Sequence, residues 1–364
     1  MKNSLKATTT LILGIISFIV LEALIFNTSF YRNFLEPTSY SGNFECAIRK
    51  ELMREKNKEI DIAAIGDSSL AEGFSEKIAD KLLSKTNIKI SNVAITGSMP
   101  RVWYYLLREI DPKCDRYDAI IICVNSYNDY DDCIEDYSNH KLDIKAVITR
   151  MDYLDIPTFA GDFRTLKDKI HVGVSMLFKG FILHEDIRDF ILNPIKRMER
   201  VQKYYNNHIN DIYNYEGNSE QFSGLSYNAD TQKLTLPNTA TENQKYWANN
   251  YLKRRLGKAD GSGYRYRKKW YQKIVDRYNG KSTVIIFVQL PLHPVLPIPP
   301  LQPDPPSSIR ELSNRYNIFY IEESYFKHLE KQEYYFDIVH LNNYGRQAFT
   351  KALVLAVLTK NMID

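Results

Sequence analysis

The sequence predicts an α/β protein with a doubly wound parallel sheet of five strands, a large and mostly helical insertion, and an N-terminal transmembrane helix. Short apolar segments alternate with amphipathic segments near both ends of the chain, which is typical of parallel strands joined by crossover helices. This alternation stops near residue 126 and resumes near residue 281, which indicates an insertion within one domain. The first 28 residues contain an apolar run long enough to cross a bilayer.

The composition is that of a globular protein, with 44% apolar and 25% charged residues among 364. The net charge of +4 leaves no strong electrostatic signature of nucleic-acid binding, so we expect no nucleic-acid partner. No Cys/His spacing resembles a metal site, and we expect neither a metal nor another cofactor. The four cysteines are Cys46, Cys114, Cys123 and Cys133. Cys123 lies in an apolar run and is expected to be a buried free thiol. Disulfides are permitted if the domain is extracytoplasmic.

The N-terminal apolar run extends from Thr8 to Phe26 and follows Lys2 and Lys6. Positive charge before the run favours an N-in orientation, and no convincing small-x-small cleavage site follows it. We therefore expect residues 1–28 to be an uncleaved signal anchor, with the rest of the chain outside the cytoplasm. Glu22 lies inside the run, where it either faces a protein partner or reaches the outer interface.

The first part of the expected sheet domain, residues 59–125, follows a stalk and lead-in helix at residues 29–58. It contains strands at 60–65, 88–95 and 119–124, and helices at 70–83 and 100–110. The helices have apolar residues at helical spacing. Pro100 lies near the first turn of the second helix, where proline is common because the N–H that it lacks would have no partner within the helix.

Residues 126–280 are polar and rich in Tyr and Asn, and we interpret them as the insertion. The second part of the sheet domain, residues 281–364, contains strands at 283–290 and 318–321, helices at 308–316 and 344–358, and a proline-dense loop at 291–306. Five strands with crossover helices predict a flavodoxin-like sheet, in which ligands bind at the carboxyl ends of the strands.

Gly66-Asp67-Ser68 follows the first strand, which places Ser68 where a substrate can reach it. A serine hydroxyl is a weak nucleophile until a base takes its proton. Among seven histidines, His340 has a carboxylate, Asp337, that can orient it from the same turn. The sequence thus predicts a triad in which Ser68 is the nucleophile, His340 the base and Asp337 the orienting group. The alternative for Ser68 is a helix N-cap.

An oxyanion hole needs donors aimed at the developing negative charge. The backbone N–H groups of Ser68 and Gly97 are candidates, and an amide after the third strand is a third, either Asn128 or Asn125. Ordinary turn roles are the alternative for Gly97 and both Asn residues. His293 follows the fourth strand and is a candidate substrate contact.

These motifs resemble the SGNH/GDSL hydrolase superfamily. Its four blocks correspond in order to Gly66-Asp67-Ser68, Gly97, Asn128-Asp129 and Asp337-x-x-His340, over residues 60–125 and 282–358. The third block departs from the family pattern, because Ser126 stands where the family usually has Gly. The resemblance implies the same triad, and an oxyanion hole formed by Ser68, Gly97 and Asn128, with Asn125 as the other option.

One N-terminal anchor with such a domain outside the membrane looks like the cell-envelope branch of this superfamily, which includes alginate O-acetylation proteins and the D-alanine transfer protein of teichoic-acid modification. This resemblance implies acyl transfer or ester hydrolysis on an envelope polysaccharide or another acylated glycan, through an acyl-Ser68 intermediate. It also implies a membrane-bound O-acyltransferase as a partner through the transmembrane helix. The alternative is a catalytically inactive scaffold, or a glycan-binding partner of such an acyltransferase.

Overall fold

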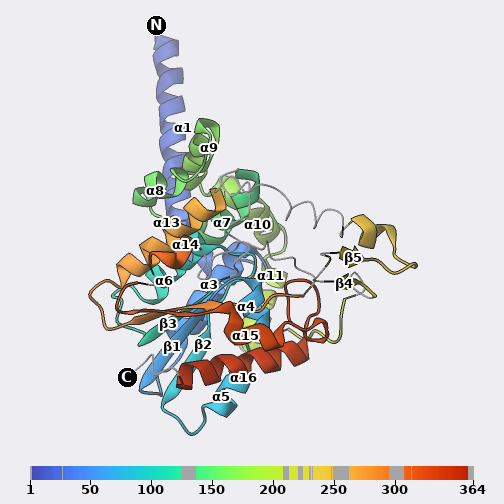
Figure 1. The fold of residues 1–364 in the computed structure, drawn as a ribbon. Coiled ribbons are helices and arrows are strands. Elements are labelled where there is room, and N and C mark those ends of the chain that lie inside the picture. The colour runs from blue at the N-terminus through green and yellow to red at the C-terminus, as the bar shows by residue number, and fades with distance from the viewer. Residues whose placement is uncertain are drawn as a thin grey trace. The chain divides into compact units, whose positions relative to one another are not determined.

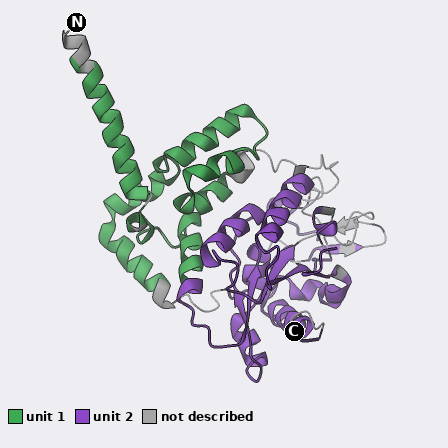
Figure 2. Ribbon diagram, turned by 90° about the vertical axis from the view of Figure 1, so that its left-hand side faces the viewer, with its two compact units in different colours: residues 1–49, 135–207 green, residues 50–134, 208–364 purple. Residues whose placement is uncertain are grey.

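The computed structural model describes residues 2–26, 28–124, 137–207, 213–219, 224–228, 231, 233–246, 248, 262–294, 307–312 and 314–359. The chain forms two compact units, shown in Figure 2. Unit 1 comprises residues 1–49 and 135–207, and unit 2 comprises residues 50–134 and 208–364. Residues 135–207 of the expected insertion therefore group with the N-terminal helices, and residues 208–280 group with the sheet.

Unit 2 contains a parallel sheet of five strands, so the predicted α/β class with an all-parallel sheet is confirmed (Figure 1). The strands are β1 (Ile60–Ile65), β2 (Ile88–Asn92), β3 (Ala119–Val124), β6 (Val284–Gln289) and β7 (Ile318–Ile321). Their order is β2-β1-β3-β6-β7. The insertion also contributes an antiparallel pair that the sequence pattern did not predict, β4 (Ser226–Asn228) and β5 (Lys233–Thr235).

The order of the strands reverses beside β1. Ile62 of β1 pairs with Ile90 of β2 on one side and with Ala119 of β3 on the other. The crossovers that leave β1 and β2 therefore run in opposite directions across the sheet. The carboxyl end of β1 lies at this reversal, which is where parallel sheets leave a crevice for ligands.

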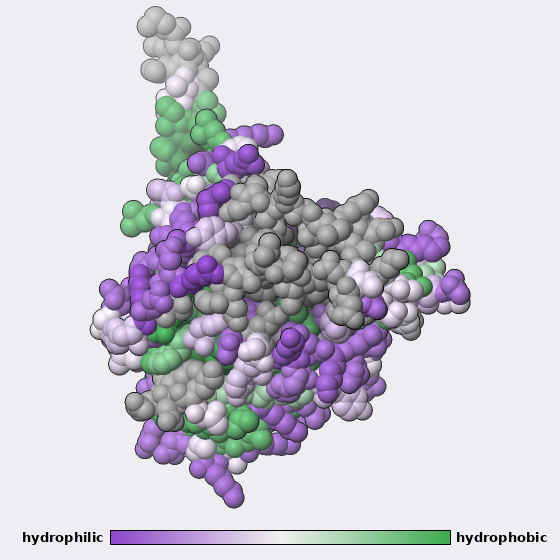
Figure 3. All heavy atoms as spheres, in the orientation of Figure 1, coloured by the Kyte–Doolittle hydropathy of each residue, from purple (hydrophilic) through white to green (hydrophobic). Residues whose placement is uncertain are grey.

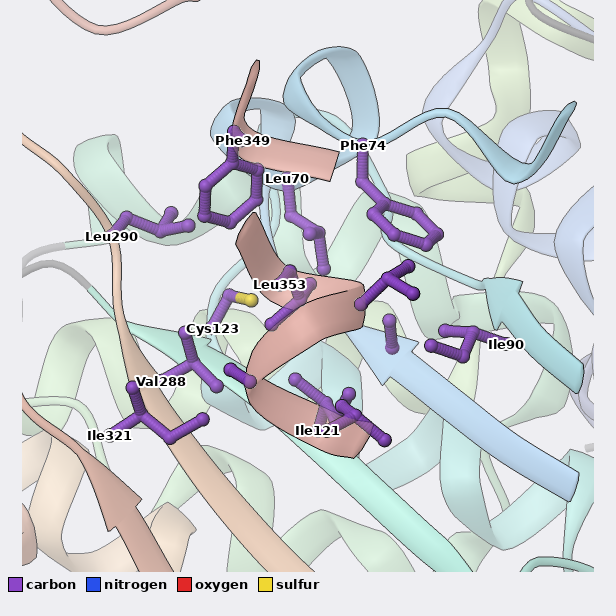
Figure 4. Close-up of a cluster of buried hydrophobic side chains, with 14 of the residues drawn as sticks. Leu70, Phe74, Ile90, Ile121, Cys123, Val288, Leu290, Ile321, Phe349 and Leu353 are labelled. Atoms are coloured by element: carbon purple, nitrogen blue, oxygen red, sulfur yellow. The ribbon is translucent and has the colours of Figure 1, made fainter. Parts of the chain in front are cut away.

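Side chains of successive strand residues point to opposite faces, and different helices cover each face. On one face the strands pack against α4 (Ser68–Gly73), α5 (Glu76–Leu82) and α16 (Asn343–Thr359), forming the cluster in Figure 4. On the other face Tyr271 of α13 (Ser262–Arg277) contacts both Trp103 of α6 (Pro100–Ile110) and Phe287 of β6, with ring centroids 6.2 and 5.5 Å apart.

Two predicted helices differ from the observed ones. The helix expected at residues 70–83 is divided into α4 and α5, because Phe74 is extended and the Ser75 side chain accepts a hydrogen bond from the Ile78 N–H at 3.4 Å. A serine that caps a new helix ends the preceding one. The helix expected at residues 308–316 is only α14 (Ser307–Arg310), and α15 (Glu323–Phe326) follows β7.

Unit 1 is helical among its described residues. Its helices are α1 (Lys2–Phe26), α2 (Ser29–Arg32), α3 (Tyr40–Met53, which continues into unit 2), α7 (Tyr137–Val147), α8 (Ile156–Ala160), α9 (Leu166–Leu177), α10 (Gly180–Leu192) and α11 (Pro194–Asn207). Buried Arg197 organises part of the unit by donating to Asp186 at 2.9 Å and to Asp189 at 2.6 Å.

Helix α1 is long and apolar enough over Thr8–Phe26 to cross a membrane, and its apolar surface is visible in Figure 3. Only 11% of that segment is buried within the protein. The Glu22 carboxylate accepts a hydrogen bond from the Gly180 N–H at 2.9 Å. The Glu22 carboxylate is therefore in contact with the chain's own helix α10.

Cys46, Cys114 and Cys123 are buried, and Cys123 is a free thiol as expected. Cys133 lies outside the described residues.

Leu353 of α16 is fully buried in the cluster of Figure 4, whereas Leu355 on the same helix is 55% exposed. We expect Leu353→Ala to destabilise unit 2 by about 2–5 kcal/mol, because it removes buried contacts and leaves a cavity. Leu355→Ala is the matched control and is expected to cost under about 0.5 kcal/mol. Denaturant midpoints of the detergent-solubilised protein measure both, and equal midpoints for the two variants would contradict the assignment of this helix face to the core.

Candidate active site

The turn between β1 and α4 presents Ser68 at the first position of α4. Asp67 caps this helix, since its carboxylate accepts a hydrogen bond from the Ser69 N–H at 2.9 Å. The N-cap is thus Asp67, and the alternative role for Ser68 is wrong. The Ser68 hydroxyl is left to interact with residues from the other end of unit 2.

Ser68, His340 and Asp337 form one continuous hydrogen-bond chain. Ser68 Oγ lies 2.9 Å from His340 Nε2. His340 Nδ1 lies 2.8 Å from Asp337 Oδ2. The structure therefore brings together all three residues that the sequence predicted, in the arrangement of nucleophile, base and orienting carboxylate.

Asp337 is fixed from its own turn as well. Its Oδ1 accepts hydrogen bonds from the N–H groups of Val339 and His340, both at 2.8 Å. Burial by itself raises the pKa of Asp337, but these bonds and the His340 ring outweigh it, so the pKa lies below its ordinary value. An ionised Asp337 holds the proton on Nδ1 and leaves Nε2 to face the serine.

The loop that carries Asp337 and His340 is anchored to α16. Asn342 caps this helix by accepting from the N–H groups of Tyr344 and Gly345, at 3.1 and 3.0 Å, and its amide donates to the Glu333 carbonyl at 2.7 Å. Gly345 is required for close packing, because a Cβ there would lie 2.1 Å from the Tyr334 carbonyl oxygen.

Three carboxylates influence His340. Burial lowers the pKa of this imidazole, but the hydrogen bond and charge of Asp337, with further charge from Glu72 and Asp67, raise it above its ordinary value. Burial conversely raises the pKa of Asp67, although the hydrogen bonds from Ser69 and the charges of His340 and Arg267 oppose it.

Glu72 is a component of the site that the sequence analysis did not single out. It lies four residues after Ser68 on α4, and its Oε2 is 3.7 Å from His340 Nε2. The Tyr215 hydroxyl lies beside the same carboxylate. The i, i+4 spacing from Ser68 was a usable signal for Glu72, whereas nothing local to Tyr215 connects it with this site.

The two backbone N–H groups predicted for the oxyanion hole are those of Ser68 and Gly97. The loop after β2 is tied to the turn, because the Ile95 N–H donates to the Gly66 carbonyl at 3.0 Å. Gly97 in this loop has φ +65°, a conformation that glycine adopts readily. Within the described part of the chain, neither the Ser68 N–H nor the Gly97 N–H donates a hydrogen bond.

The amide side chains proposed for the oxyanion hole, Asn125 and Asn128, lie outside the described residues. His293 is buried, and its ring meets that of Tyr335 edge-on with centroids 4.9 Å apart. Burial lowers the pKa of His293 to about 4, although the charge of Asp337 opposes this shift. His293 is therefore a neutral side chain near the triad, and its contact with substrate stays a prediction.

A cavity of about 690 Å³ reaches the triad at Asp337. Its walls are mostly amides and hydroxyls, with one aromatic ring: Asn218, Ser219, Thr241, Asn243, Gln244, Phe336 and Asp337. Phe336 is stacked on Tyr215, with centroids 4.4 Å apart. The insertion thus supplies a polar wall beside the predicted catalytic loop.

Among the described residues, no group of three or more His, Cys, Asp or Glu side chains is placed to hold a metal ion. No protein-family model matches the chain, and no curated protein matches it in sequence. The chemical role of the site is therefore inferred from the geometry of its side chains.

The rate at which a fluorophosphonate labels Ser68 should depend on pH through His340. Only the neutral imidazole can take the serine proton, and its raised pKa places the rise in labelling above pH 6.5. Asp337→Asn should lower this midpoint and reduce the limiting rate at least about 100-fold, since the base loses its orientation. Labelling measured by intact mass across the pH range tests this, and a rate that does not vary with pH would contradict it.

Proposed function

We propose that this chain is a membrane-anchored serine acyltransferase or acylesterase of the SGNH/GDSL type, acting outside the cytoplasm on an envelope glycopolymer. The single observation that carries the proposal is the hydrogen-bond chain from Asp337 through His340 to Ser68. It joins the three chemical roles that acyl transfer needs, in the correct order.

In the proposed reaction Ser68 Oγ attacks the carbonyl carbon of an acyl donor while His340 Nε2 takes its proton. Asp337 stabilises the resulting imidazolium. The N–H groups of Ser68 and Gly97 stabilise the oxyanion, joined by the side chain of Asn128 or Asn125. Collapse of the tetrahedral intermediate leaves acyl-Ser68, and His340 donates its proton to the leaving group.

The fold supports this assignment. Numbering the five strands in chain order gives the sheet order 2-1-3-4-5, which is that of flavodoxin-like folds. The Ser68 turn follows the first of these strands, at the reversal of strand order. The motifs that resemble the four blocks of the SGNH/GDSL superfamily begin with the residues of this turn.

A glycan is the favoured acceptor because the cavity at Asp337 is walled by amides and hydroxyls. Such groups bind hydroxyl-rich molecules through directed hydrogen bonds. The same cavity supports the second candidate function, a glycan-binding partner of a membrane-bound O-acyltransferase without catalysis of its own. A reactive Ser68 distinguishes the two.

The catalytic proposal predicts that Ser68→Ala and His340→Ala each reduce hydrolysis of a small acyl ester by at least about 10³-fold, because nucleophile and base act as one unit. The matched controls are Ser84→Ala, at an exposed serine, and His328→Ala, at an exposed histidine. Both should keep activity within about threefold. Steady-state hydrolysis by the detergent-solubilised variants measures this, and full activity in the Ser68 or His340 variant would reject an acyl-Ser68 mechanism.

The proposed anchor predicts a fixed orientation. Lys2 and Lys6 precede the apolar helix α1, and positive charge favours the cytoplasmic side. A reporter enzyme that is active only outside the cytoplasm should therefore be active when fused to the C-terminus and inactive when fused to the N-terminus. The reverse pattern would exclude an extracytoplasmic active site.

A further inference from the structure

Helix α4 carries two polar side chains on the same face. Ser68 and Glu72 are four residues apart, about one helical turn. His340 Nε2 faces both, at 2.9 Å from Ser68 Oγ and 3.7 Å from Glu72 Oε2. The second distance is too long for a hydrogen bond.

Glu72 is 6% exposed, and its Oε2 has no hydrogen-bond partner within the described part of the chain. A buried carboxylate oxygen without a donor is costly, and in a native structure it requires an explanation. The rest of the side chain is well supported, because the Tyr215 hydroxyl lies beside the carboxylate. Tyr215 is in turn held by stacking on Phe336 and by the Asn343 N–H, which donates to its carbonyl at 2.8 Å.

The neighbourhood of Oε2 matters most after Ser68 has been acylated. Ser68 Oγ then belongs to an ester and no longer shares a proton with His340. The oxygen that resolves the ester has to approach within hydrogen-bond distance of Nε2 to lose its proton. Because Glu72 Oε2 is 3.7 Å from Nε2, an oxygen in that position lies beside Glu72.

We propose that Glu72 binds the acyl acceptor through a second O–H group. The attacking O–H points at His340 Nε2, and the second O–H donates to Glu72 Oε2. Two acceptors provide this chemistry: water, which has two O–H bonds on one oxygen, and a vicinal diol, as found in sugars. A simple alcohol provides only one O–H. This inference rests on the proposed acyl-Ser68 mechanism.

In the proposed step the acceptor oxygen forms a bond to the acyl carbon, and its proton passes to His340 Nε2. The tetrahedral intermediate then breaks the bond between that carbon and Ser68 Oγ, and the imidazolium returns the proton to Oγ. Glu72 gains and loses no proton. Burial raises the pKa of Glu72, against the charge of His340 and the Tyr215 hydrogen bond, and a donated acceptor O–H would further favour its ionised form.

The test uses the full chain in detergent with p-nitrophenyl acetate as acyl donor, and ethylene glycol or ethanol as added acceptor. The initial burst of nitrophenolate measures acylation of Ser68, and the steady rate measures its resolution. Product analysis separates transfer to the diol, transfer to the alcohol and hydrolysis. Glu72→Leu removes the hydrogen-bond acceptor at similar size, whereas Glu72→Gln keeps one acceptor oxygen without the charge.

We expect Glu72→Leu to keep the acylation rate within about threefold while resolution by ethylene glycol and by water falls at least about tenfold, the loss of one hydrogen bond to a charged group. Transfer to ethanol should change little, so the preference for the diol disappears. Glu72→Gln should be intermediate. A larger loss with the diol than with water identifies the diol as the matched acceptor, and the reverse identifies water.

Two results would overturn the inference. Equal losses in acylation and resolution, the same for both variants, would mean that Glu72 acts only through its charge on His340. Unchanged kinetics would mean that it has no role. A wild-type protein that releases no nitrophenolate and forms no acetyl adduct on Ser68 by intact mass would instead reject the proposed function itself.

If Glu72→Leu does not fold, Tyr215→Phe provides the same test, because it removes the hydroxyl beside Glu72 and leaves the carboxylate. It should reduce transfer to ethylene glycol by about threefold or more with acylation unchanged. Glu216→Gln, at an exposed neighbour, is the control. Equal transfer by the Tyr215 and Glu216 variants would contradict the proposal.

Discussion

The hydrogen bond between Ser68 and His340 joins positions 272 residues apart, and unit 2 depends on bringing them together. The position of Ser68 is determined by β1, because Ser68 begins helix α4 directly after the carboxyl end of this strand. The position of His340 is determined by α16, which follows it in the chain and packs on the same face of the sheet as α4. A buried link holds the two ends, since the Ser75 N–H donates to Thr350 Oγ1 at 3.0 Å. Core packing, and not the triad itself, therefore determines the distance between nucleophile and base.

Three carboxylates, those of Asp67, Glu72 and Asp337, act on the His340 imidazole, and their different environments shift their pKa values in different directions. Asp337 receives two backbone N–H bonds and the His340 ring, which lower its pKa despite burial. The Asp67 carboxylate caps α4, and one oxygen of Glu72 has no hydrogen-bond donor among the described residues. Burial raises the pKa of both. Titratable groups whose pKa values are displaced in opposite directions mark different chemical roles. Hydrogen bonds therefore favour the charged form of Asp337, whereas burial opposes the charged form of Glu72.

The sequence was sufficient where local pattern and local structure coincide. β1 and β3 have the predicted bounds, because short apolar runs in a parallel sheet are buried on both faces. The triad was predictable because Asp337 and His340 share one turn and Ser68 follows a strand.

The break between α4 and α5 at Ser75 was not predicted, since helical periodicity continues across it and only the Ser75 cap reveals it. The Glu72–Tyr215 pair was missed because it joins α4 to the insertion across a long stretch of chain. The grouping of residues 135–207 with the N-terminal helices likewise depends on packing that no local pattern records.

Glu22, the ionisable residue inside the apolar helix α1, contacts α10 of the same chain. An ionisable residue in an apolar helix usually indicates that the helix meets another protein. Here the carboxylate accepts a hydrogen bond from the Gly180 N–H, and Phe18 of the same helix meets Phe178, with ring centroids 5.8 Å apart. Both contacts lie within unit 1, so α1 is joined to a helical body made from residues 135–207. An acyltransferase partner that binds through α1 would therefore meet a helix whose Glu22 carboxylate already accepts a hydrogen bond from its own chain.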